Sequence, residues 1–313
     1  MKPDVLIVED TINEVPIVAA LEPDFTVHLL PEKGDREAVL AEVAGRIRGM
    51  STSPLAGADA RLINALPRLE IIAIAGNHTD RIDLEAARAR NIPVTNTPPV
   101  TTEDVADLVM ALLLNVARGV AAADRFVRAG RWPLGSMPLA TQVSGKKVGI
   151  VGLGRIGRES ARRLESCRMD ISYHGPQPLA DVDYRYYPDL VEMARAVDFL
   201  VITCITRPST HHMINSPVLK ALGPQGFLVN VARGVIDEAA LVQALRDSDI
   251  AGVACDVFED EPMVPEELFA LDNVVLTPHI GAGTTEVRQA LADTPAANLR
   301  AHFAGKPLLT PVP

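Results

Sequence analysis

The chain has 313 residues, a formal net charge of −10, 48% hydrophobic residues and 22% charged residues. This length suits two domains, and the composition excludes intrinsic disorder, a collagen-like repeat and a disulfide scaffold. Only 4% of the residues are aromatic. An acidic chain with few aromatic side chains lacks the basic surface and the stacking platforms that nucleic-acid binding requires, so we expect no nucleic-acid partner.

The cysteines and the apolar segments bear on the cellular compartment. The three cysteines are far apart and form no Cys-x-x-Cys pair, which favours reduced thiols in a cytoplasmic protein. Charged and polar residues interrupt the longest apolar segment, residues 105–123, so it is predicted to be a packed helix. We therefore expect a cytoplasmic protein with no membrane partner.

In the N-terminal third, short apolar runs alternate with helical patterns, which is typical of a parallel sheet with crossover helices. Residues 5–8 and 71–75 are predicted to be buried strands, and a helix is expected to begin near Asp83. The alternation pauses at Pro98 and Pro99. A domain boundary near residue 100 follows.

Beyond this boundary, residues 101–104 form a capping-box pattern ahead of a helix predicted to run to about Ala129. A second series of strands is predicted at residues 147–151, 171–173, 199–202, 227–231, 251–255 and 274–276. The last helical stretch, residues 285–304, contains Pro295, which is expected to kink or split the helix.

A glycine motif directly follows the strand at residues 147–151 and opens a helix. The first glycine permits a tight turn, the second lets the backbone approach a pyrophosphate, and the third lets helix and strand pack closely. The helix N-terminus then faces the phosphates. The motif predicts a dinucleotide site formed by Gly152, Leu153, Gly154, Arg155, Ile156 and Gly157.

The next strand bears on the choice of cofactor. NAD sites of this kind place Asp or Glu about 20 residues beyond the glycines, to hold the ribose 2′-hydroxyl. Here the strand ends at His174 and Gly175, with Pro176 and Gln177 next, and no carboxylate is present. A 2′-phosphate would not be repelled, so NADP(H) is preferred over NAD(H), which stays possible.

Three residues further along form an acid-base set. Arg233, Glu261 and His279 each lie at or just beyond a predicted strand end, where an open α/β sheet places its ligands. Reduction of a ketone in an acid substrate needs a proton donor, a carboxylate to orient it and a fixed cation. Taken singly, each of these residues is more often structural.

Together with the glycine motif, several motifs stand in order along nearly the whole chain, at residues 75–84, 96–98, 104–107, 230–234, 256–262 and 278–281. In these motifs the chain resembles the D-isomer-specific 2-hydroxyacid dehydrogenases. Through residues 126–132 and 301–311 it is most similar, within that family, to glyoxylate/hydroxypyruvate reductases and hydroxyphenylpyruvate reductases.

The resemblance implies an α/β fold of two Rossmann-like or flavodoxin-like domains, each a doubly wound parallel sheet, with the active-site cleft between them. Residues 1–99 with 285–313 would form the substrate-binding domain, and residues 100–284 the NAD(P)-binding domain. Family members also form homodimers, and the region 104–129 would be the interface. No metal is implied.

Site roles follow from the same resemblance. His279 would be the general acid/base, Glu261 its partner, and Arg233 the group that binds the substrate carboxylate. Asn77 and His78 would contact the substrate. Most family members have a small residue at the position of His78, so the resemblance does not fix the size of the substrate pocket. Asp256 would contact the nicotinamide carboxamide. The other predicted cofactor contacts here are Ile205, Val231, Ala232, Arg233, His279 and Gly281.

These features predict an NAD(P)H-dependent 2-oxo acid reductase acting on glyoxylate or hydroxypyruvate. Hydroxyphenylpyruvate and other 2-oxo acids are alternative substrates. A non-catalytic dinucleotide-sensing or corepressor-type protein is the alternative from another class.

Overall fold

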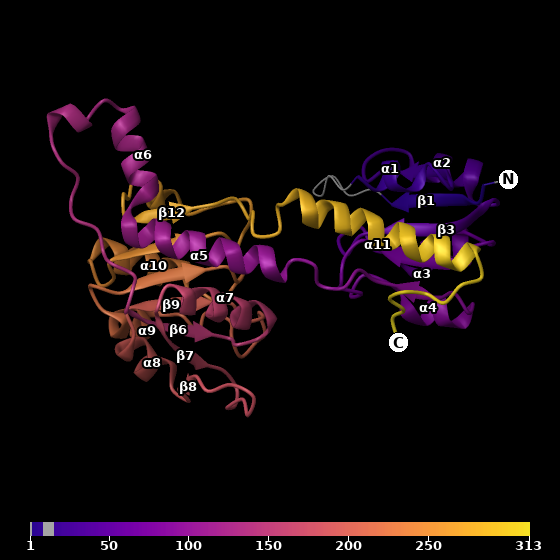
Figure 1. The fold of residues 1–313 in the computed structure, drawn as a ribbon. Helices are drawn as coiled ribbons and strands as arrows, with labels where there is room; N and C mark the ends of the chain where they lie inside the picture. The colour runs from indigo at the N-terminus through magenta and orange to yellow at the C-terminus, as the bar shows by residue number, and fades with distance from the viewer. Residues whose placement is uncertain (1, 9–15) are drawn as a thin grey trace. The chain divides into compact units, whose positions relative to one another are not determined.

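In the computed structural model, which describes residues 2–8 and 16–313, the chain divides into two compact units. Unit 1 comprises residues 1–100 and 284–313, and unit 2 comprises residues 101–283. The C-terminal segment thus returns to the unit in which the chain begins, and the yellow helix α11 lies with the indigo strands in Figure 1.

Unit 1 is built on a parallel sheet with strand order β2-β1-β3-β4-β5, the flavodoxin-like order. The strands are β1 (Asp4–Val8), β2 (Thr26–Leu30), β3 (Ile47–Thr52), β4 (Ile71–Ile74) and β5 (Val94–Thr95). Helices cover both faces, so each face has its own apolar core. The helices are α1 (Ile17–Leu21), α2 (Arg36–Val43), α3 (Ala60–Ala65), α4 (Leu84–Ala89) and α11 (Thr285–Phe303).

Helix α11 contains Pro295 but is not split by it. An interior proline removes one helical hydrogen bond and costs about 3 kcal/mol. Ala292, Ala296 and Leu299 on both sides of the proline are fully buried against the sheet and α1. This packing holds the helix together, so Pro295 does not split it.

Unit 2 is a parallel sheet with strand order β12-β11-β10-β9-β6-β7-β8. The order reverses between β6 and β9, as in a Rossmann fold, and ligands bind at such a reversal. The strands are β6 (Lys147–Val151), β7 (Asp170–His174), β8 (Arg185–Tyr186), β9 (Phe199–Ile202), β10 (Phe227–Asn230), β11 (Gly252–Cys255) and β12 (Val274–Leu276).

Helices cover both faces of this second sheet. Helices α5 and α7 share an apolar core with one face, and α8, α9 and α10 share another core with the opposite face. Their bounds are α5 (Thr102–Arg118), α6 (Val120–Arg128), α7 (Arg155–Ser166), α8 (Leu190–Ala196), α9 (Ser216–Leu222) and α10 (Glu238–Arg246), with short 3₁₀ turns at Trp132–Leu134 and Glu266–Leu268.

The helix predicted to run to Ala129 is broken at Gly119, so that prediction was wrong. Gly119 adopts a left-handed conformation (φ 61°), and its N–H donates to the carbonyl of Asn115, which closes α5. The Asn115 side chain in turn accepts from the N–H of Ala121, in the first turn of α6. The two helices are therefore bent by 60°, and α6 buries none of its residues.

In the part of the chain that the structure describes, no single helix is long and apolar enough to cross a membrane. The bent pair α5 and α6 meets the requirement only when its two members are taken together.

Candidate active site

The glycine motif forms the turn between β6 and α7, at the point where the strand order reverses. Gly152 has a φ of +93°, and a Cβ there would lie 2.5 Å from the Cβ of Cys204. A Cβ on Gly157 would lie 2.3 Å from the carbonyl oxygen of Gly152. These two positions admit only glycine, one for the turn and one for close packing of helix on strand.

Gly154 has a different surrounding, which bears on the cofactor. A Cβ at this position would meet no atom within 4 Å, and Gly154 caps α7 without any side-chain hydrogen bond to the helix N-terminus. No side chain of the cap residue therefore occupies the first N–H groups of α7, and the positive end of the helix dipole lies behind them. A dinucleotide pyrophosphate fits this surrounding.

At the end of β7, His174 Nδ1 lies 2.9 Å from the carbonyl oxygen of Tyr187 and donates to it, which leaves Nε2 free. Gly175 has no atom within 4 Å of its Cβ position. The first acidic side chain beyond β7 is Asp181, and it is paired with Arg158 at 2.9 Å. The space at the Cβ position of Gly175 is therefore open, and the first carboxylate after the strand is paired with a cation.

The three predicted catalytic residues come together in unit 2. One carboxylate oxygen of Glu261, Oε2, accepts from Arg233 Nη2 and from His279 Nδ1, the latter at 2.8 Å. Because a carboxylate only accepts, Nδ1 of His279 carries a proton and Nε2 is left for proton transfer. The side chains of Arg233 and His279 are half exposed, so the reactive edges of both are accessible.

The environment of Glu261 keeps it ionised. Burial by itself raises the pKa of its carboxyl, but hydrogen bonds from His279 and from the Phe258 N–H, with the charges of His279 and Arg233, outweigh burial. The net result is a pKa below the ordinary value. Glu261 therefore carries a negative charge that orients His279 and Arg233.

Asp256 organises the loop that carries His279. Its side chain is 1% exposed. Oδ1 accepts from the Thr277 hydroxyl at 2.6 Å and from the Ile280 N–H at 2.8 Å, and Oδ2 accepts from the Gly281 N–H at 2.9 Å. These bonds fix the backbone on both sides of His279, which has a left-handed φ of 53°. An uncommon conformation held in this way at a strand end is typical of a functional residue.

Asn230 has a related role that the sequence did not reveal. It is buried at the end of β10, where its amide donates to the carbonyl of Val257 at 3.0 Å and its oxygen accepts from the Ala232 N–H at 3.1 Å. Asn230 thus ties the loop of Arg233 to the loop after β11. A buried polar residue ending an apolar strand run was the signal that could have found it.

The remaining predicted cofactor contacts lie at strand ends of unit 2. Ile205 is exposed in the loop after β9, whereas Val231 and Ala232 directly follow β10. The N–H of Val231 donates to the carbonyl of Ile202, and the N–H of Gly281 is taken by Asp256. These amides are already used, so any cofactor contact there would involve other atoms.

The predicted substrate residues Asn77 and His78 belong to unit 1. They follow β4, in a loop that starts at Gly76, where a Cβ would lie 2.4 Å from Pro54. The side chain of Asn96 donates to the carbonyl of Asn77 at 3.2 Å, and the exposed imidazole of His78 lies 3.8 Å from Asp80. Their contact with substrate stays a prediction.

Fold and site together define a dinucleotide-dependent oxidoreductase of the 2-hydroxyacid type, and comparison with known proteins agrees. Residues 110–281 match the model for the NAD binding domain of D-isomer specific 2-hydroxyacid dehydrogenases. The chain belongs to this family, and it carries a nicotinamide dinucleotide-binding domain.

Individual relatives cover nearly the whole chain. A glyoxylate/hydroxypyruvate reductase from Arabidopsis thaliana is 46% identical, covering 93% of this chain and 94% of the relative. A hydroxyphenylpyruvate reductase from Plectranthus scutellarioides is 48% identical, covering 87% of this chain and 88% of the relative. The crystal structure of an NADPH-dependent glyoxylate/hydroxypyruvate reductase from Sinorhizobium meliloti, in complex with NADP and malonate, is 40% identical with a TM-score of 0.80, over 100% and 97% of the two chains.

Proposed function

We propose that this protein is an NADPH-dependent reductase that converts glyoxylate or hydroxypyruvate to the corresponding 2-hydroxy acid. The observation that carries the proposal is the carboxylate of Glu261, which contacts both Arg233 and His279. This group combines a fixed cation, a proton donor and a carboxylate that orients both. Reduction of a 2-oxo acid needs all three.

Each residue has a defined part in this reaction. Arg233 binds the carboxylate of the substrate through guanidinium N–H groups other than the one engaged by Glu261, and it polarises the carbonyl. Bound reduced nicotinamide supplies the hydride to the carbonyl carbon. Nε2 of protonated His279 gives its proton to the carbonyl oxygen, while the bond from Nδ1 to Glu261 holds the ring and stabilises its positive charge.

Substrate choice is supported by the relatives. The Arabidopsis and Sinorhizobium proteins are named for glyoxylate and hydroxypyruvate, and the Plectranthus protein for hydroxyphenylpyruvate. The test is a panel of these three 2-oxo acids, assayed with NADPH and with NADH. Glyoxylate or hydroxypyruvate should give the highest kcat/KM. Preference for hydroxyphenylpyruvate would reassign the substrate, and turnover of none would favour a dinucleotide-sensing protein.

The role of His279 has its own test. His279→Gln should lower kcat by about 10²–10⁴-fold with little change in NADPH affinity, because general acid catalysis contributes that much. His302→Gln is the matched control, since His302 also lies beside a glutamate, Glu70, but belongs to unit 1. Wild-type kcat in His279→Gln would remove the residue from the mechanism.

The preference for NADPH is supported by the open space at Gly175, by the free Nε2 of His174 and by the pairing of Asp181 with Arg158. A carboxylate placed at the end of β7 would repel a 2′-phosphate and accept from a 2′-hydroxyl instead. His174→Asp should therefore lower kcat/KM for NADPH and raise it for NADH. An unchanged ratio would show that this strand end does not select the cofactor.

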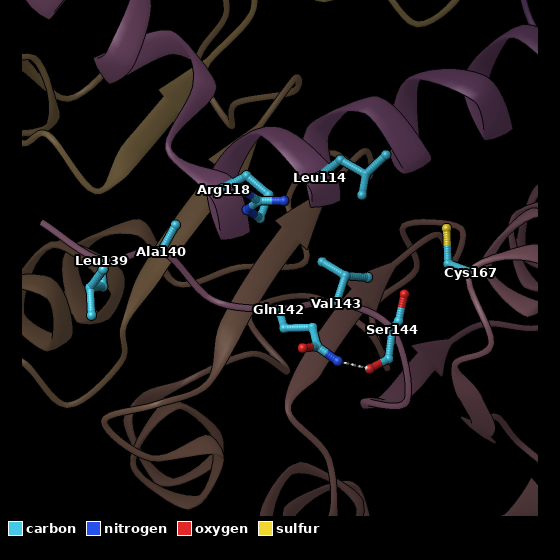
Figure 2. A pocket seen from close by; sticks show the side chains of 8 residues that line it. All are labelled: Leu114, Arg118, Leu139, Ala140, Gln142, Val143, Ser144 and Cys167. Carbon is cyan, nitrogen blue, oxygen red and sulfur yellow. Dashed lines mark hydrogen bonds between the residues drawn. The ribbon is translucent and has the colours of Figure 1, made fainter. Parts of the chain in front are cut away.

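A homodimer is the proposed assembly, and the surface of residues 120–139 supports it. Val120, Val127, Trp132, Leu134 and Leu139 are exposed apolar residues within this short segment, and a concentration of exposed apolar side chains is typical of an interaction site. A pocket of about 470 Å³ shares Leu139 with this segment. It is lined by Leu114, Arg118, Leu139, Ala140, Gln142, Val143, Ser144 and Cys167 (Figure 2).

Sedimentation equilibrium tests this assembly. The wild-type chain should sediment at twice its mass of 33.5 kDa. Leu134→Glu, at a side chain that is 86% exposed, should shift the equilibrium toward the monomer without unfolding the protein. Leu309→Glu is the control, because Leu309 is an exposed leucine in unit 1. A monomeric wild-type chain would contradict the proposal.

A further inference from the structure

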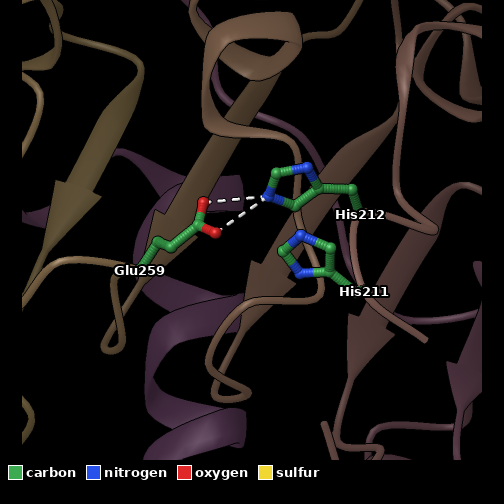
Figure 3. Close-up of side chains that lie close together, drawn as sticks. All are labelled: His211, His212 and Glu259. Atoms are coloured by element: carbon green, nitrogen blue, oxygen red, sulfur yellow. Dashed lines mark hydrogen bonds and ion pairs between the residues drawn. The ribbon is translucent and has the colours of Figure 1, made fainter. Parts of the chain in front are cut away.

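A second cluster of ionisable side chains lies in unit 2, apart from Arg233, Glu261 and His279. His211 and His212 lie between β9 and α9, and Glu259 lies in the loop after β11. Each offers one metal-ligand atom, and these atoms all lie within 4.8 Å of one another. In Figure 3 the two imidazole rings lie one above the other and His212 points at the carboxylate.

The pair His212 and Glu259 lies a few tenths of an ångström closer together than two ligands on one ion. Nε2 of His212 lies 3.0 and 2.9 Å from the two carboxylate oxygens of Glu259. A nitrogen and an oxygen bound to the same tetrahedral zinc at about 2.1 Å each are about 3.4 Å apart. An ion can enter between them with a small movement of the side chains, and the Nε2 proton is released as it does so.

The third ligand is oriented by the backbone. Nδ1 of His211 lies 3.1 Å from the carbonyl oxygen of Gly234 and donates to it, which places the free lone pair on Nε2. A histidine whose other ring nitrogen donates to a carbonyl is the usual arrangement for a metal ligand. The exposed His211 ring stacks on His212 with centroids 3.8 Å apart. Because stacked rings do not aim their in-plane lone pairs at one point, the His211 side chain must turn out of the stack to bind the same ion, and its exposure allows that rotation.

The backbone around both loops is held independently of any ion. The carbonyl of Gly234 also accepts from the N–H of His212 at 3.2 Å, and His212 has a left-handed φ of 51°. The N–H of Glu259 donates to the carboxylate of Glu238 at 2.9 Å. Little backbone ordering therefore remains to oppose binding.

We propose that His211, His212 and Glu259 form a binding site for one transition-metal ion of the Zn²⁺ type, with an open fourth position. Two imidazole nitrogens and one carboxylate oxygen suit Zn²⁺, Co²⁺ or Ni²⁺, whereas Mg²⁺ and Ca²⁺ prefer oxygen ligands. The ion joins the loop after β9 to the loop after β11. Because His211 rests on Gly234 and Glu259 precedes Glu261 by two residues, the ion restrains the two loops that carry Arg233 and Glu261.

The test is calorimetric titration of the chelator-treated full-length protein with ZnCl₂, with visible spectra of the Co²⁺ form as a second readout. The wild-type protein should bind one ion at this site and show tetrahedral Co²⁺ bands. His211→Gln and Glu259→Gln should each weaken Zn²⁺ binding about tenfold or more and lose the bands. His211→Gln is the primary variant, since the exposed ring can be replaced without disturbing the fold.

Two controls separate this site from other histidine-glutamate pairs. His302→Gln removes a histidine that lies 3.5 Å from Glu70, and His279→Gln removes the histidine paired with Glu261. Both should bind Zn²⁺ as the wild type does. Undiminished binding by His211→Gln, loss of binding in His279→Gln, or the absence of stoichiometric binding in the wild type would each overturn the proposal.

Discussion

Replacement of Asp256 by Asn tests whether a buried carboxylate holds the loop of His279. The substitution preserves size and shape but leaves one acceptor oxygen where there were two. If the amide oxygen takes the place of Oδ1, the amide nitrogen faces the Gly281 N–H; in the opposite orientation it faces the Ile280 N–H. Either way a buried backbone donor loses its partner.

The magnitude follows from those contacts. A lost hydrogen bond to a charged group costs about 1.5–3 kcal/mol, and the orphaned donor adds about 1–3 kcal/mol. These two costs describe partly the same loss and are not simply added, so we expect the free energy of unfolding to fall by about 3 kcal/mol. With a urea dependence of about 2–3 kcal/mol/M for a unit of this size, the unfolding midpoint of unit 2 should fall by about 1 M. The displaced His279 should also lower kcat about tenfold to a hundredfold.

The assay is urea unfolding followed by circular dichroism, together with steady-state kinetics. Asp237→Asn is the matched control, because Asp237 caps α10 by accepting from the Ala240 N–H at 3.0 Å and asparagine caps equally well. A wild-type midpoint and a wild-type kcat in Asp256→Asn would refute the reasoning, since neither loop geometry nor stability would then depend on the carboxylate.

Three further outcomes are expected. Gly154→Ala should unfold like the wild type yet bind NADPH more weakly. Gly157→Ala should lower the unfolding midpoint, because a Cβ at Gly157 meets backbone and a Cβ at Gly154 does not. Equal effects of the two substitutions would contradict the different roles of the two glycines. The pKa of Glu261 is lowered in the folded protein, so its carboxylate stabilises the fold fully above about pH 4.3 and loses this effect as pH falls through the folded-state pKa. The difference in unfolding midpoint between wild type and Glu261→Gln should therefore vanish on acidification. A difference that stays constant with pH would exclude the carboxylate charge as its source. Burial raises the pKa of the Cys204 thiol to about 11, so iodoacetamide at pH 8 should modify it far more slowly in native than in denatured protein, as measured by mass spectrometry.

The sequence was most informative where strands are fully buried. The runs that became β1, β4, β6, β9 and β10 are continuous and apolar, as parallel strands covered on both faces must be. Strand β2 escaped prediction because it is an edge strand in which only Leu30 is buried, and β5 and β8 because each has only two residues. The end of α5 at Gly119 was missed because glycine can also continue a helix, and the sequence does not show that this glycine adopts the left-handed conformation.

The site could be predicted as residue types but not as contacts. Arg233, Glu261 and His279 stand out because they follow strand ends, and the carboxyl ends of parallel strands meet at one edge. The carboxylate of Asp256 is different, since its partners Thr277, Ile280 and Gly281 become visible only when β11 and β12 are paired. No local pattern indicates which donors a buried carboxylate will receive.

In the proposed mechanism, the charges of Arg233, Glu261 and His279 also explain how an acidic chain would hold an anionic substrate. With His279 neutral, Arg233 and Glu261 cancel, and the three side chains carry no net charge. With His279 protonated they carry one positive charge, which attracts the single carboxylate of a 2-oxo acid at short range. In the proposed reaction, the protonated form of His279 is also the form that gives a proton to the carbonyl oxygen. In that form the three side chains would offer the substrate a local positive charge, despite a net charge of −10 on the chain.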